Sequence, residues 1–381
     1  MGRVLHILLN GKGLDKYPSI YNALYCWSKL GWSNYIITSG GTDEFTALIT
    51  QEYRFSGGYA KRAAQLAYIS GYFDIAIVYD PQDVEAFYAT RYLFPRNAYR
   101  KLVHHCLEIP VGSSKGRSLF TIWLHKMLGG GYQLIDHLII QDKSRGDLFF
   151  NTFPGLKAVP WHLVTNSFIN VTEPVAPSLR WFDDLRAQSK FLVLYTGTIE
   201  RWAFPEGLFE VLLGIQDATF LFSGWSDGGY AEGLVERYRM ASNIRFHIGA
   251  KRRAEFNYMV ANADVGLVCY ESPDQNVREV GLSSGKLHKF LSFQKPVLTN
   301  GISSLHHFIT HNGFGMSVPV GDFPEAVRQL ADNHQTFCEN IRKCYTALCN
   351  FEEEYMAFVQ AVLNRAHEPD NVRTFEESRA C

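Results

Sequence analysis

The chain has 381 residues, of which 46% are hydrophobic and 20% charged, and its formal net charge is -1. This composition is that of a folded globular protein, and the length exceeds what one hydrophobic core usually supports, so two domains are expected. A net charge near zero gives no general attraction for nucleic acid, which is excluded as a partner. An anionic ligand must therefore be bound by a local cluster of cations.

The cysteines and the first residues of the chain indicate the cellular compartment. Seven cysteines are scattered along the chain, and no CxxC pair has the spacing of a zinc site. The opening residues, MGRVLHILLN, lack the layout of a signal peptide and are expected to form a strand. No run approaches the ~18 apolar residues that span a bilayer. The sequence thus predicts a cytoplasmic protein with reduced thiols and no metal site.

Residues 1–171 alternate short apolar runs with helical patterns, which is typical of parallel βαβ units. Near-continuous apolar runs are expected where both faces of a sheet are covered. The expected strands are 4–9, 35–38, 74–79, 101–107, 137–141 and 159–164. Helices are expected at 19–30 and 59–70. This half is predicted to be one Rossmann-like domain.

The segment 172–190 is rich in proline and polar residues, and Pro174 and Pro177 do not suit a core strand. It is interpreted as an interdomain linker. The alternation then resumes over 191–350, which predicts a second Rossmann-like domain. Its expected strands are 191–196, 219–223, 244–248, 265–270, 296–299 and 315–319. Its expected helices include 206–213, 230–240, 253–261 and 286–293.

The last segment, 351–381, places apolar residues on one helical face. These residues are Phe351, Tyr355, Phe358, Val359, Val362 and Leu363. A helix and tail that pack back on the N-terminal domain are predicted. The expected fold class is therefore α/β, with two doubly wound parallel sheets that face a central cleft, where ligands of open α/β sheets bind.

Residues 282–291 (LSSGKLHKFL) carry the most informative local pattern. A serine, Ser283 or Ser284, can cap the helix, and Gly285 lets a ligand approach the backbone. Free N–H groups at a helix N-terminus, together with Lys286 beside them, form an anion site. The alternative is an ordinary capped surface helix with a solvated lysine.

Three stretches in order favour the anion site: 194–199 (LYTGTI), 262–270 (NADVGLVCY) and the SSGKL segment followed by KPVL. Together they resemble the nucleotide-sugar half of GT-B glycosyltransferases, nearest to glycosyltransferase family 4. The resemblance covers 190–300 well and the N-terminal half more weakly. It implies that 1–171 binds the acceptor, that 191–350 binds the nucleotide sugar, and that no cofactor is needed beyond this nucleotide-diphosphate sugar co-substrate.

The resemblance also implies site residues. Lys286 would bind the donor diphosphate, with Ser284 and Gly285 at the start of its helix. Gly197 and Thr198 would form a turn close to the diphosphate. Arg201 would be a second cation on the leaving group, although a surface arginine is the alternative. With these cations and no DxD-type metal motif, a metal-independent, retaining hexosyltransferase is expected.

One position departs from the family pattern. A ribose-binding glutamate is expected seven residues before Pro296, where this sequence has Lys289. A lysine donates hydrogen bonds but cannot accept them, so ribose recognition must differ. Lys289 could instead add charge near the phosphates. The partner acidic position is Gly281, with Glu279 nearby, so the donor cannot be identified from these residues.

The first half offers weaker candidates. Gly11 and Gly13 follow the first strand, where glycines leave room for a ligand on the acceptor side of the cleft or simply form a turn. Residues 103–110 (VHHCLEIP) resemble the family's "hxHE-p" segment, which would make Glu108 a catalytic residue. An inverting route with Glu108 as base stays open. His105 is assigned to the acceptor-side cleft, with a buried structural histidine as the alternative.

The segment 115–128 combines apolar and basic residues. It is interpreted either as a buried helix under a cationic loop or as a helix at the lipid interface, which would give peripheral contact with the inner face of the membrane.

The predicted function is transfer of a sugar from a nucleotide-diphosphate sugar to a glycan or lipid-linked saccharide, in the synthesis of surface polysaccharide or glycoconjugate. A GT-B-fold nucleotide-sugar epimerase and a non-catalytic sugar-nucleotide binding module are the alternatives. Donor sugar, nucleotide base and acceptor cannot be read from the sequence.

Overall fold

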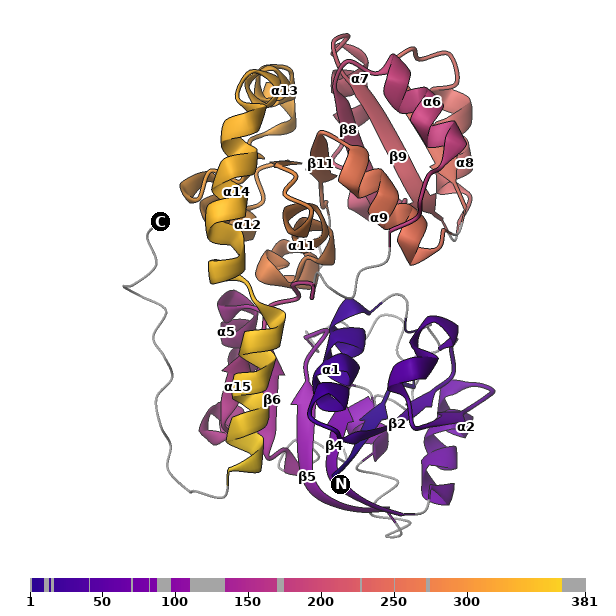
Figure 1. Cartoon of the computed structure of the whole chain (residues 1–381), viewed down its shortest axis with the longest axis vertical. Coiled ribbons are helices and arrows are strands. Elements are labelled where there is room, and N and C mark those ends of the chain that lie inside the picture. The colour runs from indigo at the N-terminus through magenta and orange to yellow at the C-terminus, as the bar shows by residue number, and fades with distance from the viewer. Residues whose placement is uncertain are drawn as a thin grey trace. The chain divides into compact units, whose positions relative to one another are not determined.

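A computed structural model of the chain describes residues 2–9, 14, 17–40, 42–69, 71–81, 83–87, 97–109, 134–169, 175–226, 228–249, 251–271 and 275–364 (Figure 1). The chain forms two compact units. The first contains the residues up to Asn166 together with helix α15 (Phe351–Leu363), and the second is Ser167–Asn350.

The first unit is built on a seven-stranded sheet in the order β3-β2-β1-β4-β5-β6-β7, and its pairings are parallel. The strands are β1 (Arg3–Ile7), β2 (Ser33–Thr38), β3 (Gln51–Arg54), β4 (Gly71–Val78), β5 (Asn97–His105), β6 (His137–Ile140) and β7 (Trp161–Leu163). This unit also contains helices α1 (Pro18–Lys29), α2 (Tyr59–Gln65) and α5 (Lys143–Thr152), and the 3-10 turns η2 (Asp43–Leu48), η3 (Leu66–Tyr68) and η5 (Pro154–Ala158).

The second unit has a six-stranded sheet in the order β10-β9-β8-β11-β12-β13, again with parallel pairings. The strands are β8 (Leu192–Thr198), β9 (Thr219–Trp225), β10 (Ile244–Ile248), β11 (Val265–Val268), β12 (Val297–Thr299) and β13 (Gly315–Ser317). The helices are α6 (Arg180–Gln188), α7 (Leu208–Leu213), α8 (Tyr230–Arg237), α9 (Arg253–Asn262), α10 (Gln275–Arg278), α11 (Gly285–Ser292), α12 (Ser303–His311), α13 (Phe323–Asp332) and α14 (His334–Leu348). Its described residues also form the 3-10 turns η7 (Arg201–Ala203), η8 (Gly281–Ser283) and η9 (Val320–Asp322).

Helices cover both faces of the second sheet, which explains why its inner strands β8 and β11 are mostly apolar. Alternate residues of β8 illustrate this: Val193 packs with residues of α7, α8 and α13, whereas Leu194 packs with residues of α6, α9, α11, α12 and α14. The apolar area removed from water on both faces stabilises this unit, at about 25 cal/mol per Å² buried.

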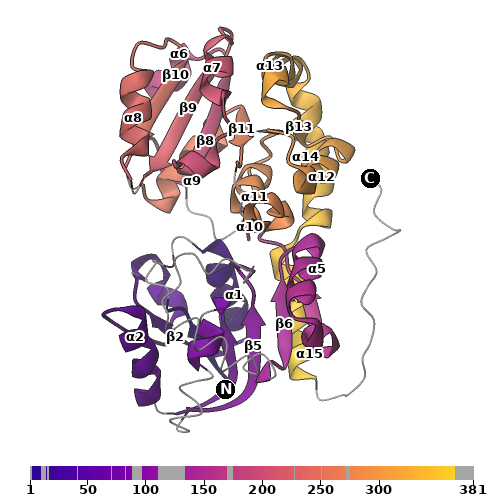
Figure 2. The ribbon, with the colours of Figure 1, turned by 180° about the vertical axis from the view of Figure 1, so that it is seen from behind.

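Helix α15 completes the core of the first unit although it lies at the other end of the sequence (Figure 2). The Trp27 indole N–H of α1 donates to the Tyr355 hydroxyl at 3.1 Å. The Glu354 carboxylate accepts from the Thr165 backbone N–H at 2.7 Å. The Lys101 ammonium of β5 donates to the Val362 carbonyl near the end of the helix.

The structure departs from the sequence expectations in three places. The edge strand β3 was not expected, because its sequence, QEYR, is polar. The expected linker 172–190 contains helix α6, whose Phe182 is fully buried in the second unit. Leu363 is 41% exposed, so it does not belong to the buried face of α15.

No helix in the described ranges is both long and apolar enough to cross a membrane.

Candidate functional site

The strand order of the second sheet reverses between β8 and β11, which are neighbours in the sheet. In open parallel sheets the carboxyl ends of such strands form a ligand-binding crevice. The end of β8 turns at Gly197, whose φ of +116° favours glycine. On the next strand, a Cβ at Gly224 would stand 1.7 Å from the Gly197 carbonyl oxygen, so only glycine fits there. The backbone therefore packs tightly at this end of the sheet.

Helix α11 begins at the same end of the sheet. The Ser284 side chain accepts from the Leu287 N–H at 3.2 Å and caps the helix. A Cβ at Gly266 of β11 would stand 2.1 Å from the Phe290 ring, so glycine there lets α11 lie close on the strand. His288 anchors the helix through the Leu282 carbonyl and the Tyr345 hydroxyl. The first N–H groups of a helix have no partner within it, so this rigidly held end presents donors.

Lys286 lies at the centre of this arrangement. Its Nζ donates to the Tyr195 hydroxyl at 2.7 Å. The same Nζ lies 4.2 Å from the centre of the Tyr195 ring and 4.5 Å from the centre of the Tyr270 ring. Its side chain passes Gly197, where a Cβ would stand 3.9 Å from Lys286 Cδ. The predicted positions Gly197, Thr198, Ser284, Gly285 and Lys286 thus gather in one place.

The charge of Lys286 has no carboxylate partner within the described part of the chain. Burial lowers the pKa of Lys286 to about 7. Nearby Cys269 is fully buried, and burial raises the pKa of its thiol to about 12, so a neutral thiol adjoins the amine. An ammonium that is removed from water and has no counter-charge tends to lose its proton, and an anion bound beside it favours the charged form again.

The residues around Lys286 are fixed by further hydrogen bonds. The Tyr195 hydroxyl donates to the Thr198 carbonyl at 2.6 Å. The Tyr270 and Ser284 hydroxyl oxygens lie 2.8 Å apart. The Asn300 side chain accepts from the Tyr270 N–H and donates to the Tyr270 carbonyl, at 3.2 and 2.9 Å. The ends of β8, β11 and β12 are therefore joined to the start of α11.

Three other predicted residues of the second unit have contacts that differ from those of Lys286. Arg201 is exposed on η7, and its charge acts on Tyr230 of α8. Glu279 follows α10, and its backbone N–H bonds to the Gln275 carbonyl. The Lys289 ammonium donates to Asn257 Oδ1 at 2.9 Å and lies 3.8 Å from the centre of the Phe168 ring. Lys289 and Lys286 thus have different partners.

The first unit contains the remaining predicted residues. Glu108 follows β5 with an exposed carboxylate, 3.7 Å from the nearly buried guanidinium of Arg145. His105, which was assigned to the acceptor-side cleft, has a fully buried ring near Tyr79 and Tyr355, in agreement with the alternative of a buried structural histidine. Strand β5 is an inner strand, so its side chains face the covering helices. The predicted residues Gly11 and Gly13 and the segment 115–128 lie outside the described residues.

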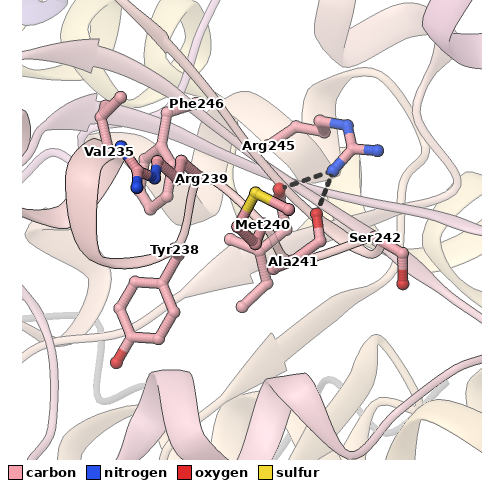
Figure 3. Close-up of a pocket in the computed structure, with 9 residues that line it drawn as sticks. Val235, Tyr238, Arg239, Met240, Ala241, Ser242, Arg245 and Phe246 are labelled. Carbon is pink, nitrogen blue, oxygen red and sulfur yellow. Dashed lines mark hydrogen bonds between the residues drawn. The ribbon is translucent and has the colours of Figure 1, made fainter.

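A surface pocket of about 380 Å³ lies elsewhere in the second unit, beside α8 and β10 (Figure 3). The Arg245 guanidinium there donates to the carbonyls of Ala241 and Ile244. This pocket is at the amino end of β10, whereas Lys286 is at the carboxyl ends of β8 and β11, so the two are separate. Among the described residues, no group of three or more His, Cys, Asp or Glu side chains could hold a metal ion.

Sequence reasoning did not identify Tyr195, Tyr270 or Asn300 as parts of the site. Tyr195 stands two residues before Gly197, but its contact with Lys286 joins positions 91 residues apart. Tyr270 closes the quoted stretch NADVGLVCY, where tyrosine is also a common strand residue. The only sequence signal was that Tyr195 and Tyr270 each come directly after a run of apolar strand residues.

No protein-family model matches the chain, and no curated protein matches it in sequence. Solved structures do match. HepE from Anabaena, in complex with UDP and glucose, has 14% identity and a TM-score of 0.69, covering 95% of this chain and 99% of its own. WaaG, a glycosyltransferase involved in lipopolysaccharide biosynthesis, has 12% identity and a TM-score of 0.62, covering 95% and 100%. A UDP-N-acetylglucosamine 2-epimerase has 11% identity and a TM-score of 0.56, covering 93% and 90%. The chain has the two-domain GT-B fold of these proteins.

Proposed function

We propose that the protein is a glycosyltransferase that moves a sugar from a nucleotide-diphosphate sugar to a hydroxyl group of a glycan or lipid-linked saccharide. The observation that carries this proposal is Lys286 at the reversal point of the second sheet, where its Nζ has no carboxylate partner among the described residues. It adjoins a helix N-terminus and a glycine turn, which together suit a diphosphate. A UDP complex of a protein with the same fold supports a nucleotide donor.

The chemistry follows from where negative charge develops. When the bond between the sugar and the diphosphate breaks, the departing diphosphate gains charge. Lys286 and the first N–H groups of α11 would donate to that group from fixed positions. Such donors stabilise the transition state more than the ground state, and each commonly contributes ~3 kcal/mol. This supply of charge supports a metal-independent reaction.

The other predicted residues enter as proposals. The turn at Gly197 and Thr198 would approach the diphosphate through its backbone. Arg201 would reach the leaving group from the exposed turn η7. Glu108, whose carboxylate lies near a buried arginine, would act on the acceptor or the donor sugar. Retention of configuration is the proposed outcome, and an inverting reaction would assign Glu108 the role of base.

A donor screen tests the function. The protein is incubated with UDP-, GDP- and dTDP-sugars, and released nucleotide, transferred sugar and altered donor are measured. We expect slow donor hydrolysis or transfer with at least one donor, and loss of turnover by at least 100-fold in Lys286→Ala. The matched control is Lys190→Ala, because the Lys190 side chain is 85% exposed in the same unit. Near-normal turnover in Lys286→Ala would remove Lys286 from the reaction.

The same screen separates the two alternatives. An isomerised donor without transfer would identify an epimerase, for which one solved structure of the same fold is a precedent. Binding without turnover for every donor would identify a non-catalytic binding module. Transfer to a glycan or lipid-linked acceptor excludes both.

A further inference from the structure

We infer that Tyr195 and Tyr270 are positioning residues that hold the Lys286 ammonium at the strand ends and leave its charge available to the donor diphosphate. This inference rests on the proposed function. It concerns how the ammonium is held in place. A lysine side chain has four rotatable bonds and would otherwise be free to extend into water.

The hydroxyl of Tyr195 has a fixed role. A phenol has one proton, and here that proton goes to the Thr198 carbonyl at 2.6 Å. The same oxygen must therefore accept from Lys286 Nζ, at 2.7 Å. The Tyr195 ring is fully buried, with Phe204 and Phe222 at centroid distances of 4.8 and 5.8 Å. The acceptor thus stands in one place before any ligand arrives.

Tyr270 holds the ammonium from a second strand. Its ring centre lies 4.5 Å from Nζ, within the range of a cation–π contact. The ring is itself held at both ends, by Ser284 at the hydroxyl and by Asn300 at the backbone. Because β8 and β11 are neighbours in the sheet, the two tyrosines clamp the ammonium directly over the strand ends.

The choice of aromatic partners has a chemical consequence. A carboxylate would also orient the ammonium, but it would neutralise the charge and compete with the phosphate. Aromatic rings attract the cation through their quadrupole and carry no net charge. An ammonium has three N–H groups and gives one to Tyr195, and the described residues offer no acceptor for the other two. These two are available for phosphate oxygens.

The test uses four variants of the full chain. Tyr195→Phe keeps the ring and removes the acceptor. Tyr270→Leu removes the aromatic face, and Tyr270→Phe keeps it. Tyr68→Leu is the control, because Tyr68 is 85% exposed and lies in the other unit. Retained circular dichroism and thermal melting establish that each variant folds.

The first readout needs no ligand. In competitive acetylation with trace reagent, mass spectrometry compares Lys286 with the exposed Lys190 in each protein. With the reaction followed across a pH series, we expect the reactivity of Lys286 to level off above about pH 7 in the parent protein, as its low pKa implies, while that of Lys190 keeps rising with pH. In Tyr195→Phe and Tyr270→Leu the released ammonium extends into water, so the Lys286 profile should shift toward that of Lys190. The same profile for the two lysines in the parent, or an unchanged Lys286 profile in these two variants, overturns the clamp.

The second readout is binding of inorganic pyrophosphate and of UDP by calorimetry. We expect Kd to rise about 10-fold in Tyr195→Phe and about 5-fold in Tyr270→Leu, with less than a twofold change in Tyr270→Phe and Tyr68→Leu. Unchanged affinity in the first two refutes the positioning role. If the acetylation results hold while pyrophosphate binds and no nucleotide sugar is bound or turned over, the proposed function fails and the clamp stands.

Discussion

Replacing Lys286 by methionine is expected to stabilise the unliganded protein, because the fold disfavours the charge of this lysine. Burial lowers its pKa from 10.5 to about 7, a difference of about 3.5. At about 1.36 kcal/mol for each pKa unit, keeping the group in the folded state at pH 7 costs about 4 kcal/mol. Loss of the hydrogen bond to Tyr195 offsets about 1–2 kcal/mol of this. The expected net gain is therefore about 2–3 kcal/mol.

The pH dependence gives the sharper result. Between pH 7 and 10.5 the unfolded chain still binds the Lys286 proton, whereas the folded protein has released it. Stability of the parent protein therefore rises with pH across this window, by about 2 kcal/mol from pH 7 to pH 9 relative to Lys286→Met. The advantage of the methionine variant should shrink by that amount.

Urea unfolding at pH 7, 8 and 9 measures this difference. Hydrogen exchange of peptides from β8 and β11 reports on the second unit by itself. Lys190→Met is the control, since that side chain is 85% exposed, and it should change stability little at any of the three values. The reasoning is refuted if Lys286→Met is less stable than the parent at pH 7, or if the difference between them is the same at pH 7 and pH 9.

UDP affinity should fall about 50-fold from pH 7 to pH 9, because only the protonated Lys286 attracts the diphosphate. Calorimetry in two buffers near pH 8 should show that the protein takes up a proton when UDP binds. An affinity that does not change with pH would contradict this prediction. Gly224→Ala should lower the melting temperature and weaken UDP binding, because its Cβ would meet the Gly197 carbonyl, whereas Gly228→Ala has no atom within 4 Å and should do neither. The first unit should unfold before the second on acidification, because burial lowers the pKa of five of its histidines. Between pH 6.5 and 5 these histidines bind protons in the unfolded chain but not in the folded unit, which lowers the stability of the unit by up to about 2 kcal/mol for each histidine. Hydrogen exchange at pH 7, 6 and 5 distinguishes this order from simultaneous unfolding.

Much of the fold could be predicted because buried parallel strands have a strong signature. Runs such as FLVLY at 191–195 are apolar on every residue, as a strand covered on both faces requires. Two elements lack such a signature. The edge strand β3 has a polar sequence, and α6 lies in a segment that was interpreted as a linker because it is rich in proline and polar residues. In both cases tertiary packing outweighs the local pattern.

The site could be predicted in part for a different reason. Ser284, Gly285 and Lys286 are consecutive, so capping and charge rules locate them together. Tyr195 and Tyr270 meet Lys286 only because β8 and β11 are adjacent in the sheet, a fact of topology that local patterns do not contain. The burial of His105 could not be predicted for a similar reason. Side chains alternate between the two faces of a strand, but this alternation does not say which face of β5 is covered by helices α1 and α15.

The position of α15 bears on how the chain folds as it is synthesised. The described residues of the second unit form one continuous segment, 167–350, which can become compact once it has left the ribosome. The first unit must wait for residues 351–363, because Trp27 and Tyr355, 328 residues apart, share its interior. Although translated first, it is completed last, and its exposed apolar surface until then is where chaperones would be needed.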